Sequence, residues 1–483
     1  MSLSQPRVST SSTTAERSTT VDDSTTVDGH ETLVACVDFG STFTKAALVQ
    51  VPSGRLVATA SHRTTIDTDV LDGWEACLAA LVDADPAAAT AEVLACSSAG
   101  GGLRIAVVGN EELVTAEAGR RVALSSGGRV VHVAAGGLTR ADVATLRAAK
   151  PDVVLLVGGT DGGNAEVLLA CATALARARW RGPVVVAGNV DAQAEVAALL
   201  DSAGTSHVLA DNVVPRIGVL APESARAAIR EMFLRHVIGG KHLSSRADFT
   251  AMVRGATPDV VLTAVELLAR GLDDERPGAS DVVVVDVGGA TTDVHSVVEV
   301  DPEDAGLSRQ VVATVPVSRT VEGDLGMRWS AVSTVEAGIA AGLLDASLLD
   351  AAAARQADPS LVPLDEAGRA DDRAIAAAAV ALALRRHAGR SQVVFGPDGR
   401  AVERSGKDLR EVGLLVGSGG VMRHSGADAE TVLRRHLAAA PGDGWQLPEH
   451  PRTVIDRDYV LAPAGLLATE HPDAARRLLG SLL

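Results

Sequence analysis

The chain has 483 residues, of which 47% are hydrophobic and only 2% aromatic, so it suits two or three domains with cores built from Ala, Val and Leu. Its formal net charge of −17 argues against a non-specific nucleic-acid-binding protein, which needs a basic surface. No run of about 18 uncharged apolar residues offers a membrane-spanning helix, and the first residues lack the apolar core of a signal peptide.

The four cysteines lie far apart in apolar surroundings, and none belongs to a CxxC pair. Buried reduced thiols fit this pattern better than disulfides or a metal cluster do, so we expect a cytoplasmic protein. The residues are Cys36, Cys77, Cys96 and Cys171.

Ser and Thr dominate residues 1–31, which have almost no large apolar side chains, so we expect a disordered tail there. Apolar periodicity then predicts an ordered α/β segment. Its expected elements are strands at 33–38, 44–51, 55–61, 92–97 and 103–109 and a helix at 72–83.

The motif Asp38-Phe-Gly-Ser-Thr-Phe-Thr-Lys45 begins where the first apolar strand ends. Glycines let backbone N–H groups close around a phosphate, and hydroxyl side chains add further donors. Asp38 at the strand end can hold a hydrated divalent cation or orient a water. The candidate phosphate-binding residues of this motif are Gly40, Ser41, Thr42 and Lys45.

Residues 111–210 alternate helix and strand, which predicts a parallel sheet with helices on its faces. Ligands of such sheets bind beyond the carboxyl ends of the strands, and the loop Gly158-Gly-Thr-Asp-Gly-Gly163 lies at one such end. Asp161 in this loop is a candidate contact for a nucleotide or substrate. The alternative is a structural glycine loop in which Asn164 caps the next helix.

Residues 222–246 form the most basic stretch of the chain. Arg226 and Arg230 fall on one face of an expected helix. This face is either solvated or a docking patch for an acidic partner or a phosphate, and the sequence leaves both interpretations open.

A second motif, Asp286-Val-Gly-Gly-Ala-Thr-Thr-Asp293, follows an expected exposed linker at 273–278 and the apolar strand 282–285. It repeats the order of strand, aspartate, glycine and hydroxyl residue, which suggests two similar lobes that face one another. Its candidate phosphate-binding residues are Gly288, Gly289, Thr291 and Thr292, and its candidate metal-binding carboxylates are Asp286 and Asp293.

Further strands are expected near 293–300 and 310–316, after which residues 320–327 lead into a helix. Glu322 and Asp324 there either face a cleft or cap the helix. A third glycine loop follows strand 412–416 and suits the sugar and base of a nucleotide; it comprises Gly417, Ser418, Gly419 and Gly420. The other expected elements are a surface stretch at 345–372, an Ala-rich helix at 374–387, a β-hairpin at 392–403 and helices at 428–439 and 471–482.

The three glycine loops, in this order, resemble those of the actin-like ATPase superfamily, which holds sugar kinases, Hsp70 chaperones and actin. The resemblance implies a two-lobed actin-like α/β fold of the ribonuclease H-like class with an additional β-α-β segment, and ATP with Mg²⁺ as cofactors. It makes Asp38, Asp286 and Asp293 candidate catalytic residues as well as metal ligands. The expected organisation is a tail (1–31), an N-terminal lobe with the insertion (32–275) and a C-terminal lobe with the adenosine loop (276–483).

The chain between about residues 32 and 470 also resembles the glutamate mutase accessory family, known as MutL or GlmL. This resemblance implies an ATP-using accessory or reactivating protein for an adenosylcobalamin-dependent glutamate (methylaspartate) mutase, with the oligomeric state left open. The motifs that carry it are the two aspartate motifs together with Val157-Gly-Gly-Thr-Asp-Gly-Gly163, Ala187-Gly-Asn189, Asp211-Asn-Val-Val-Pro-Arg-Ile-Gly218 and Val321-Glu-Gly-Asp-Leu-Gly-Met327.

Other functions compete with this interpretation. A small-molecule kinase would pass the γ-phosphate to an alcohol or carboxylate and needs a base, for which Asp161 is the candidate. An actin-like scaffold without hydrolysis is disfavoured because all three aspartates are present. An iron–sulfur ATPase is disfavoured because no cysteine pair offers cluster ligands.

Overall fold

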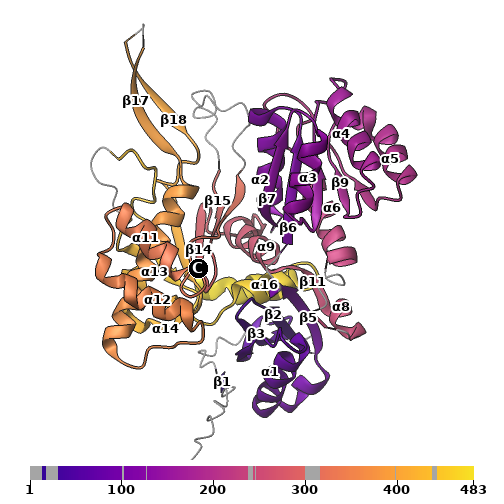
Figure 1. The fold of residues 1–483 in the computed structure, drawn as a ribbon. Coiled ribbons are helices and arrows are strands. Elements are labelled where there is room, and N and C mark those ends of the chain that lie inside the picture. The colour runs from indigo at the N-terminus through magenta and orange to yellow at the C-terminus, as the bar shows by residue number, and fades with distance from the viewer. Residues whose placement is uncertain are drawn as a thin grey trace, which may run out of the picture.

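The computed structural model describes residues 14–17, 31–99, 103–126, 128–237, 243–244, 246–299, 316–396, 399–437 and 443–483. Three larger sheets organise these residues, two of them in lobes that flank a central pair of helices and one in an inserted α/β unit (Figure 1). No helix in the described part of the chain is long and apolar enough to cross a membrane. All four cysteines are buried free thiols, as predicted.

The sheet of the first lobe is built on an apolar strand, β2, which the sequence predicts from the run at 33–37. Two antiparallel strands follow β2 in a meander, and two later strands run parallel to it on its other side, in the order β4-β3-β2-β5-β11. The strands are β2 (Thr32–Phe39), β3 (Phe43–Val51), β4 (Arg55–Arg63), β5 (Glu92–Ser97) and β11 (Val253–Ala256).

The sheet of the second lobe repeats this topology. Its order is β16-β15-β14-β19-β20, again with an antiparallel meander on one side of the first strand and parallel strands on the other. The strands are β14 (Val282–Val287), β15 (Thr292–Val297), β16 (Val317–Glu322), β19 (Leu414–Ser418) and β20 (Arg452–Ile455). The chain therefore has the predicted two-lobed actin-like α/β fold.

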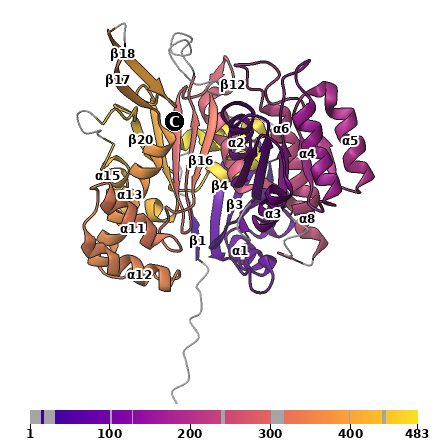
Figure 2. The same cartoon turned by 45° about the horizontal axis from the view of Figure 1, so that its top comes forward.

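Between β5 and β11 the chain builds a third sheet, which is parallel throughout, in the order β10-β9-β8-β6-β7. This confirms the parallel sheet predicted from the helix–strand alternation. Its strands are β6 (Leu103–Gly109), β7 (Gly128–Ala135), β8 (Val153–Leu156), β9 (Val184–Val186) and β10 (His207–Leu209). Helix α2 of this unit lies beside the edge strand β16 of the second lobe (Figure 2).

Two helices, α9 and α16, lie between the two lobe sheets (Figure 1). One continuous apolar core joins them to side chains of both sheets, including Val34 and Val49 of the first lobe and Val284 and Val416 of the second. All seven residues of α16 are buried, which is why its sequence LAPAGLL shows no amphipathic period. The helix was not predicted.

The helices of the described chain are α1 (Val70–Ala84), α2 (Glu117–Ser125), α3 (Arg140–Ala148), α4 (Glu166–Arg177), α5 (Gln193–Ser202), α6 (Glu223–Met232), α8 (Ala247–Met252), α9 (Thr257–Arg270), α11 (Ala331–Ala340), α12 (Leu349–Ala357), α13 (Glu366–His387), α14 (Gly420–His424), α15 (Ala429–Arg434), α16 (Leu461–Leu467) and α17 (Pro472–Leu478). The predicted hairpin near 392–403 is β17 (Arg390–Gly396) with β18 (Gly399–Ser405).

Three expectations need correction. Within the tail, β1 (Thr14–Arg17) pairs with β4, so these four residues form a strand; the rest of 1–30 lies outside the described residues. The strand expected at 310–316 also falls almost wholly outside the described residues. The strand observed in this region is β16, which includes residues 320–322 that were expected to lead into a helix. The linker expected at 273–278 forms a short hairpin of β12 (Gly271–Asp273) and β13 (Arg276–Pro277). The domain boundary at 275 and 276 falls in this hairpin and stays a prediction.

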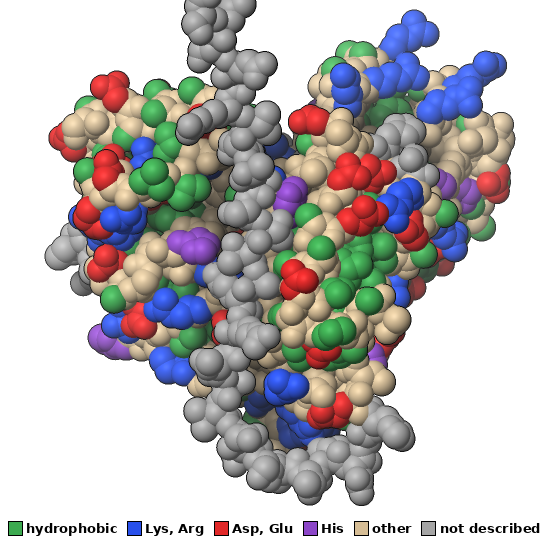
Figure 3. Space-filling view, turned by 90° about the horizontal axis from the view of Figure 1, so that it is seen from below, with side chains coloured by type: hydrophobic (Ala, Val, Ile, Leu, Met, Phe, Trp, Pro, Cys, Tyr) green, Lys and Arg blue, Asp and Glu red, His purple; other side chains and the backbone are tan. Residues whose placement is uncertain are grey.

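The basic stretch at 222–246 also differs from expectation. Arg230 pairs with the buried Asp259 of α9 at 2.6 Å, and Arg226 pairs with Glu266 at 3.0 Å. These two arginines therefore tie α6 to α9, with Arg226 largely buried and the Arg230 side chain still 42% exposed. Figure 3 shows acidic and basic side chains interspersed over the face seen from below, so no single sign of charge dominates that face.

Candidate functional site

The two aspartate motifs form β-hairpins whose turns touch. A Cβ placed on Gly289 of the second turn would lie only 3.2 Å from the hydroxyl oxygen of Thr42 in the first. The third glycine loop joins them from β19, because a Cβ on Gly419 would lie 2.3 Å from the Val287 carbonyl oxygen and 3.0 Å from a carboxylate oxygen of Asp286. Gly419 has a φ of +102°, which favours glycine at this close approach.

Each hairpin turn is closed by its own backbone and leaves one hydroxyl without a partner. The N–H of Gly40 donates to the Phe43 carbonyl, and that of Gly288 donates to the Thr291 carbonyl. The hydroxyl oxygens of Thr42 and Thr292 are buried, yet neither has a hydrogen-bond partner in the described chain. Buried polar atoms are nearly always satisfied, so the orphaned Thr42 hydroxyl, which faces Gly289 of the second turn, fits a ligand with oxygen acceptors such as a phosphate. Thr292 lies on the same face of the second-lobe sheet as Val287 and Val294, in the second-lobe core, and not on the face that carries Asp286 and Asp293.

Asp38 is 4% exposed at the end of β2 and is already held by protein donors. Its Oδ1 accepts from the hydroxyl of Thr257 at 2.5 Å, and its Oδ2 accepts from the hydroxyl of Tyr459 at 2.6 Å. The Cys96 thiol lies 3.6 Å from Oδ1. Asp38 is therefore anchored to α9 and to the turn before α16 as well as to its own lobe.

Asp286 lies at the centre of the second-lobe site, between Asp293 on one neighbouring strand and Ser418 on the other. Its pKa is raised to about 6, mainly by burial; Lys45 opposes this shift, and the negative charges of Asp293 and Asp38 contribute to it. Asp456, at the end of β20, also has its pKa raised to about 6 by burial. A carboxyl group with a pKa near neutrality can exchange a proton with water during a reaction.

Asp293 is bound within the protein rather than directed at a ligand. Its Oδ1 accepts from the guanidinium of Arg319 at 2.7 Å, and both side chains are largely buried. The same guanidinium lies 3.4 Å from the carbonyl oxygen of Leu124 at the end of α2. Arg319 thereby connects the second hairpin to the inserted unit.

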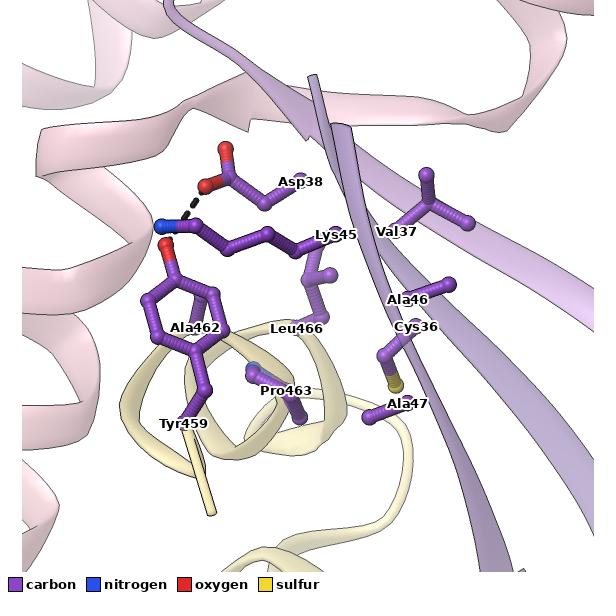
Figure 4. A pocket seen from close by; sticks show the side chains of 10 residues that line it. All are labelled: Cys36, Val37, Asp38, Lys45, Ala46, Ala47, Tyr459, Ala462, Pro463 and Leu466. Carbon is purple, nitrogen blue, oxygen red and sulfur yellow. Dashed lines mark hydrogen bonds between the residues drawn. The ribbon is translucent and has the colours of Figure 1, made fainter. Parts of the chain in front are cut away.

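Lys45 lies against an aromatic ring. Its Nζ is 3.7 Å from the ring centroid of Tyr459, whose hydroxyl reaches Asp38 (Figure 4). A cavity of ≈10 Å³ beside the ring is lined by these three residues and by small apolar side chains of β2, β3 and α16. Lysine, tyrosine and aspartate thus form one polar cluster between the two lobes.

The remaining predicted residues lie in different settings. Ser41 is exposed at the first turn, the Thr291 hydroxyl donates to Asp293, and Gly420 begins α14. A Cβ on Gly417 would face Ile455 and Leu433, so this glycine lies against the core.

Asp161 belongs to the inserted sheet. Its Oδ1 accepts from the side chain of Asn212 at 2.8 Å and from the backbone of Val190 at 3.2 Å. Its own N–H donates to the Pro215 carbonyl. These bonds join the loops after β8, β9 and β10, so the contacts of Asp161 in the described chain are with its own unit and not with the three glycine loops.

The carboxylates of Asp38, Asp286 and Asp293 do not lie close enough together to hold one metal ion between them. Within the described chain, the one group of three acidic or histidine ligand atoms close enough for a shared ion is Glu92, Glu470 and His471, on the outer surface. Asp38, Asp286 and Asp293 form no such cluster, and Asp293 is neutralised by Arg319. The arrangement fits a hydrated cation held by phosphates and one or two carboxylates better than a site made of protein ligands alone.

Sequence reasoning missed four residues that the fold brings here: Thr257, Arg319, Asp456 and Tyr459. Only two carried a usable signal. Asp456 directly follows the β-branched residues Thr453-Val-Ile455 at the end of a strand, and Tyr459 is the one tyrosine of the chain.

A larger crevice of ≈490 Å³ lies between the inserted unit and the second lobe. Its walls include Arg120 and Arg129 on one side and Glu322 on the other, and Arg386 pairs with Glu322 and Asp324 at 2.8 and 2.6 Å. The crevice adjoins the second hairpin because Glu322 is the cross-strand partner of Thr292.

Comparisons with known proteins agree on one family. The model of the MutL protein family matches residues 34–483. Protein MutL of Clostridium tetanomorphum is 37% identical over 455 residues, which cover 92% of this chain and 98% of that protein.

Solved structures resemble the chain only distantly. The nucleotide-free structure of an acetone carboxylase is 14% identical with a TM-score of 0.40, covering 91% of this chain and 70% of that one. Gluconate kinase from Lactobacillus acidophilus is 11% identical with a TM-score of 0.33, covering 94% and 92%. Similarity at this level adds nothing to the topology described above. The family match rests on nearly the whole chain at 37% identity, and the chain belongs to the MutL protein family.

Proposed function

We propose that this protein binds Mg-ATP between its two lobes and hydrolyses it as an accessory, reactivating partner of an adenosylcobalamin-dependent glutamate (methylaspartate) mutase in the cytoplasm. The observation that carries nucleotide binding is the pair of touching hairpins, each with an aspartate at its strand end, and the unpartnered buried hydroxyl of Thr42 where the two turns meet. The proposal that the partner is this mutase is supported by the chain's membership of the MutL protein family.

The residues divide the work by their chemistry. Thr42 and the glycine turns donate hydrogen bonds to phosphate oxygens, and Lys45 supplies a positive charge. Asp38 and Asp286 would hold the water shell of a cation, which would supply positive charge to the phosphates. Asp286, with its pKa near 6, accepts a proton from the attacking water.

A protein partner suits the architecture because side-chain contacts connect the second hairpin to the large inserted α/β unit. Arg319 connects Asp293 to the carbonyl end of α2 in the inserted sheet. A ligand shifts a conformational equilibrium only by its differential affinity for the two states, and a broad protein surface can supply more of that difference than a small molecule.

The runner-up is a small-molecule kinase, which the ≈490 Å³ crevice favours, since this volume is in the range of small-ligand pockets. Arg129 lines it and has no hydrogen-bond or ion-pair partner in the described chain, so an acceptor with a carboxylate or phosphate would fit. Burial raises the pKa of Glu322, which makes Glu322 a better candidate base than Asp161.

The deciding experiment measures ATP turnover with holo-mutase, with inactivated mutase, and with a panel of sugars, acids and polyols. We expect the mutase to stimulate turnover, most strongly in its inactivated form, and mutase activity to return when ATP and free cofactor are supplied. If one small molecule raises turnover and is recovered phosphorylated in stoichiometric yield, the kinase function replaces the accessory one.

A further inference from the structure

Tyr459 occupies a turn that is held in a disfavoured conformation. It lies between β20 and α16 with a φ of +56°, a region that residues with a Cβ rarely adopt. Asp456 fixes this turn, since its buried carboxylate accepts from the backbone N–H of Val460 at 2.7 Å. The backbone is therefore constrained to aim the Tyr459 side chain at the first lobe.

The side chain engages both charged residues of the first motif at once. Its hydroxyl donates to Asp38 Oδ2 at 2.6 Å, and its ring lies under the Lys45 ammonium at 3.7 Å (Figure 4). Tyr459 comes from the segment that follows the last strand of the second-lobe sheet, whereas Asp38 and Lys45 are cross-strand partners in the first-lobe sheet. One side chain thus joins the two lobes at the point where the hairpins meet.

These contacts of Tyr459 compete with a Mg-nucleotide for Asp38 and Lys45. Asp38 Oδ1 already accepts from Thr257, so Oδ2 is the oxygen left for the water shell of a cation, and Tyr459 holds it. The Lys45 ammonium is likewise engaged by Tyr459, 3.7 Å from the ring centroid. Burial keeps the pKa of the Tyr459 hydroxyl well above its usual value, so the group remains a hydrogen-bond donor.

We propose that Tyr459 is an interlobe latch, closed in the nucleotide-free protein by its contacts with Asp38 and Lys45 and opened when a Mg-nucleotide takes both residues. This inference rests on the proposed nucleotide function. It makes the latch a positioning device that links occupancy of the site to the contact between the lobes.

The single tyrosine makes the latch directly observable. Protein grown with 3-fluorotyrosine carries one ¹⁹F label, at position 459, so its spectrum reports this ring alone. We expect the resonance to move when Mg-ADP or a non-hydrolysable Mg-ATP analogue is added, and to stay in place when Mg²⁺ is added without nucleotide.

Two variants test the competition by their nucleotide affinity, measured by calorimetry. Tyr459→Phe keeps the ring on Lys45 and removes only the hydroxyl. A hydrogen bond to a charged group contributes roughly one to two powers of ten in an equilibrium constant, so we expect binding to become about ten- to a hundredfold tighter. Thr257→Val is the matched control, because it removes one hydrogen bond from the other oxygen of the same carboxylate. Because Tyr459 still holds Oδ2 in this variant, Thr257→Val should tighten binding less than Tyr459→Phe does.

The outcomes separate the latch from the function on which it rests. Measurable nucleotide binding with an unmoved ¹⁹F resonance, or equal affinity changes in the two variants, overturns the latch and leaves the nucleotide function standing. Absence of binding to wild-type protein and to both variants overturns the nucleotide function and the latch with it.

Discussion

Arg319 offers the sharpest test of how the second hairpin is stabilised. Its side chain is 3% exposed, bonds the carboxylate of Asp293 at 2.7 Å, and lies 3.4 Å from the Leu124 carbonyl. Replacing it by Leu keeps apolar volume but leaves the largely buried Asp293 charge without its counter-ion. Removing one partner of a buried ion pair costs about 3–5 kcal/mol, so we expect the free energy of unfolding to fall by that amount.

The assay is denaturant unfolding followed by circular dichroism, carried out as a double-mutant cycle with Asp293→Asn. Most of the cost of Arg319→Leu should come from the uncompensated carboxylate rather than from lost packing. In the Asp293→Asn background the same substitution should therefore cost less than half as much.

A comparable buried pair elsewhere in the second lobe provides the control. Arg355 is 4% exposed and bonds Asp372 at 2.6 Å, where Arg328 also reaches the carboxylate at 3.1 Å. Arg355→Leu should destabilise the protein less than Arg319→Leu does, because Asp372 keeps one cation. Equal costs of Arg319→Leu in both backgrounds would refute the reasoning.

Three further predictions concern Asp286 and the bound nucleotide. Burial raises the folded-state pKa of Asp286 to about 6, so the native protein binds a proton more tightly than the unfolded chain, and this residue lowers the stability as pH rises from about 4 to 6. In urea titrations the stability of Asp286→Asn relative to wild type should therefore increase over that pH range. A constant difference would contradict this prediction. The rate of ATP hydrolysis, measured by phosphate release, should rise with pH through about 6. Hydrolysis should be lost in Asp286→Ala and Asp38→Ala although both variants still bind nucleotide. Unchanged hydrolysis in both variants would show that these two residues do not belong to the site. ATP and ADP should favour different lobe angles, because the γ-phosphate can bridge the two hairpins, and identical small-angle scattering with the two nucleotides would exclude this movement.

The sequence by itself determined the hairpins. A β-branched or apolar run followed by aspartate, glycine and hydroxyl residues has few other conformations available, and the same local pattern occurs twice. It therefore predicted β2, β3, β14 and β15 with their turns, and the lobe repeat that follows from them. The alternation of residues 111–210 likewise indicated a parallel sheet, because parallel neighbours need a crossover connection and a helix between the strands supplies one.

Tertiary structure decided what the polar residues do. Asp293 and Asp38 belong to equivalent motifs, yet one is neutralised by Arg319 and the other is held by Thr257 and Tyr459, all distant in sequence. Asp161 lies in a glycine loop typical of a ligand site, but its contacts brace the inserted sheet. Helix α16, buried on every side, has no amphipathic period to reveal it. Local patterns follow from short-range backbone sterics, whereas the partner of a buried charge depends on which strands and helices the fold brings beside it, and no local pattern carries that information.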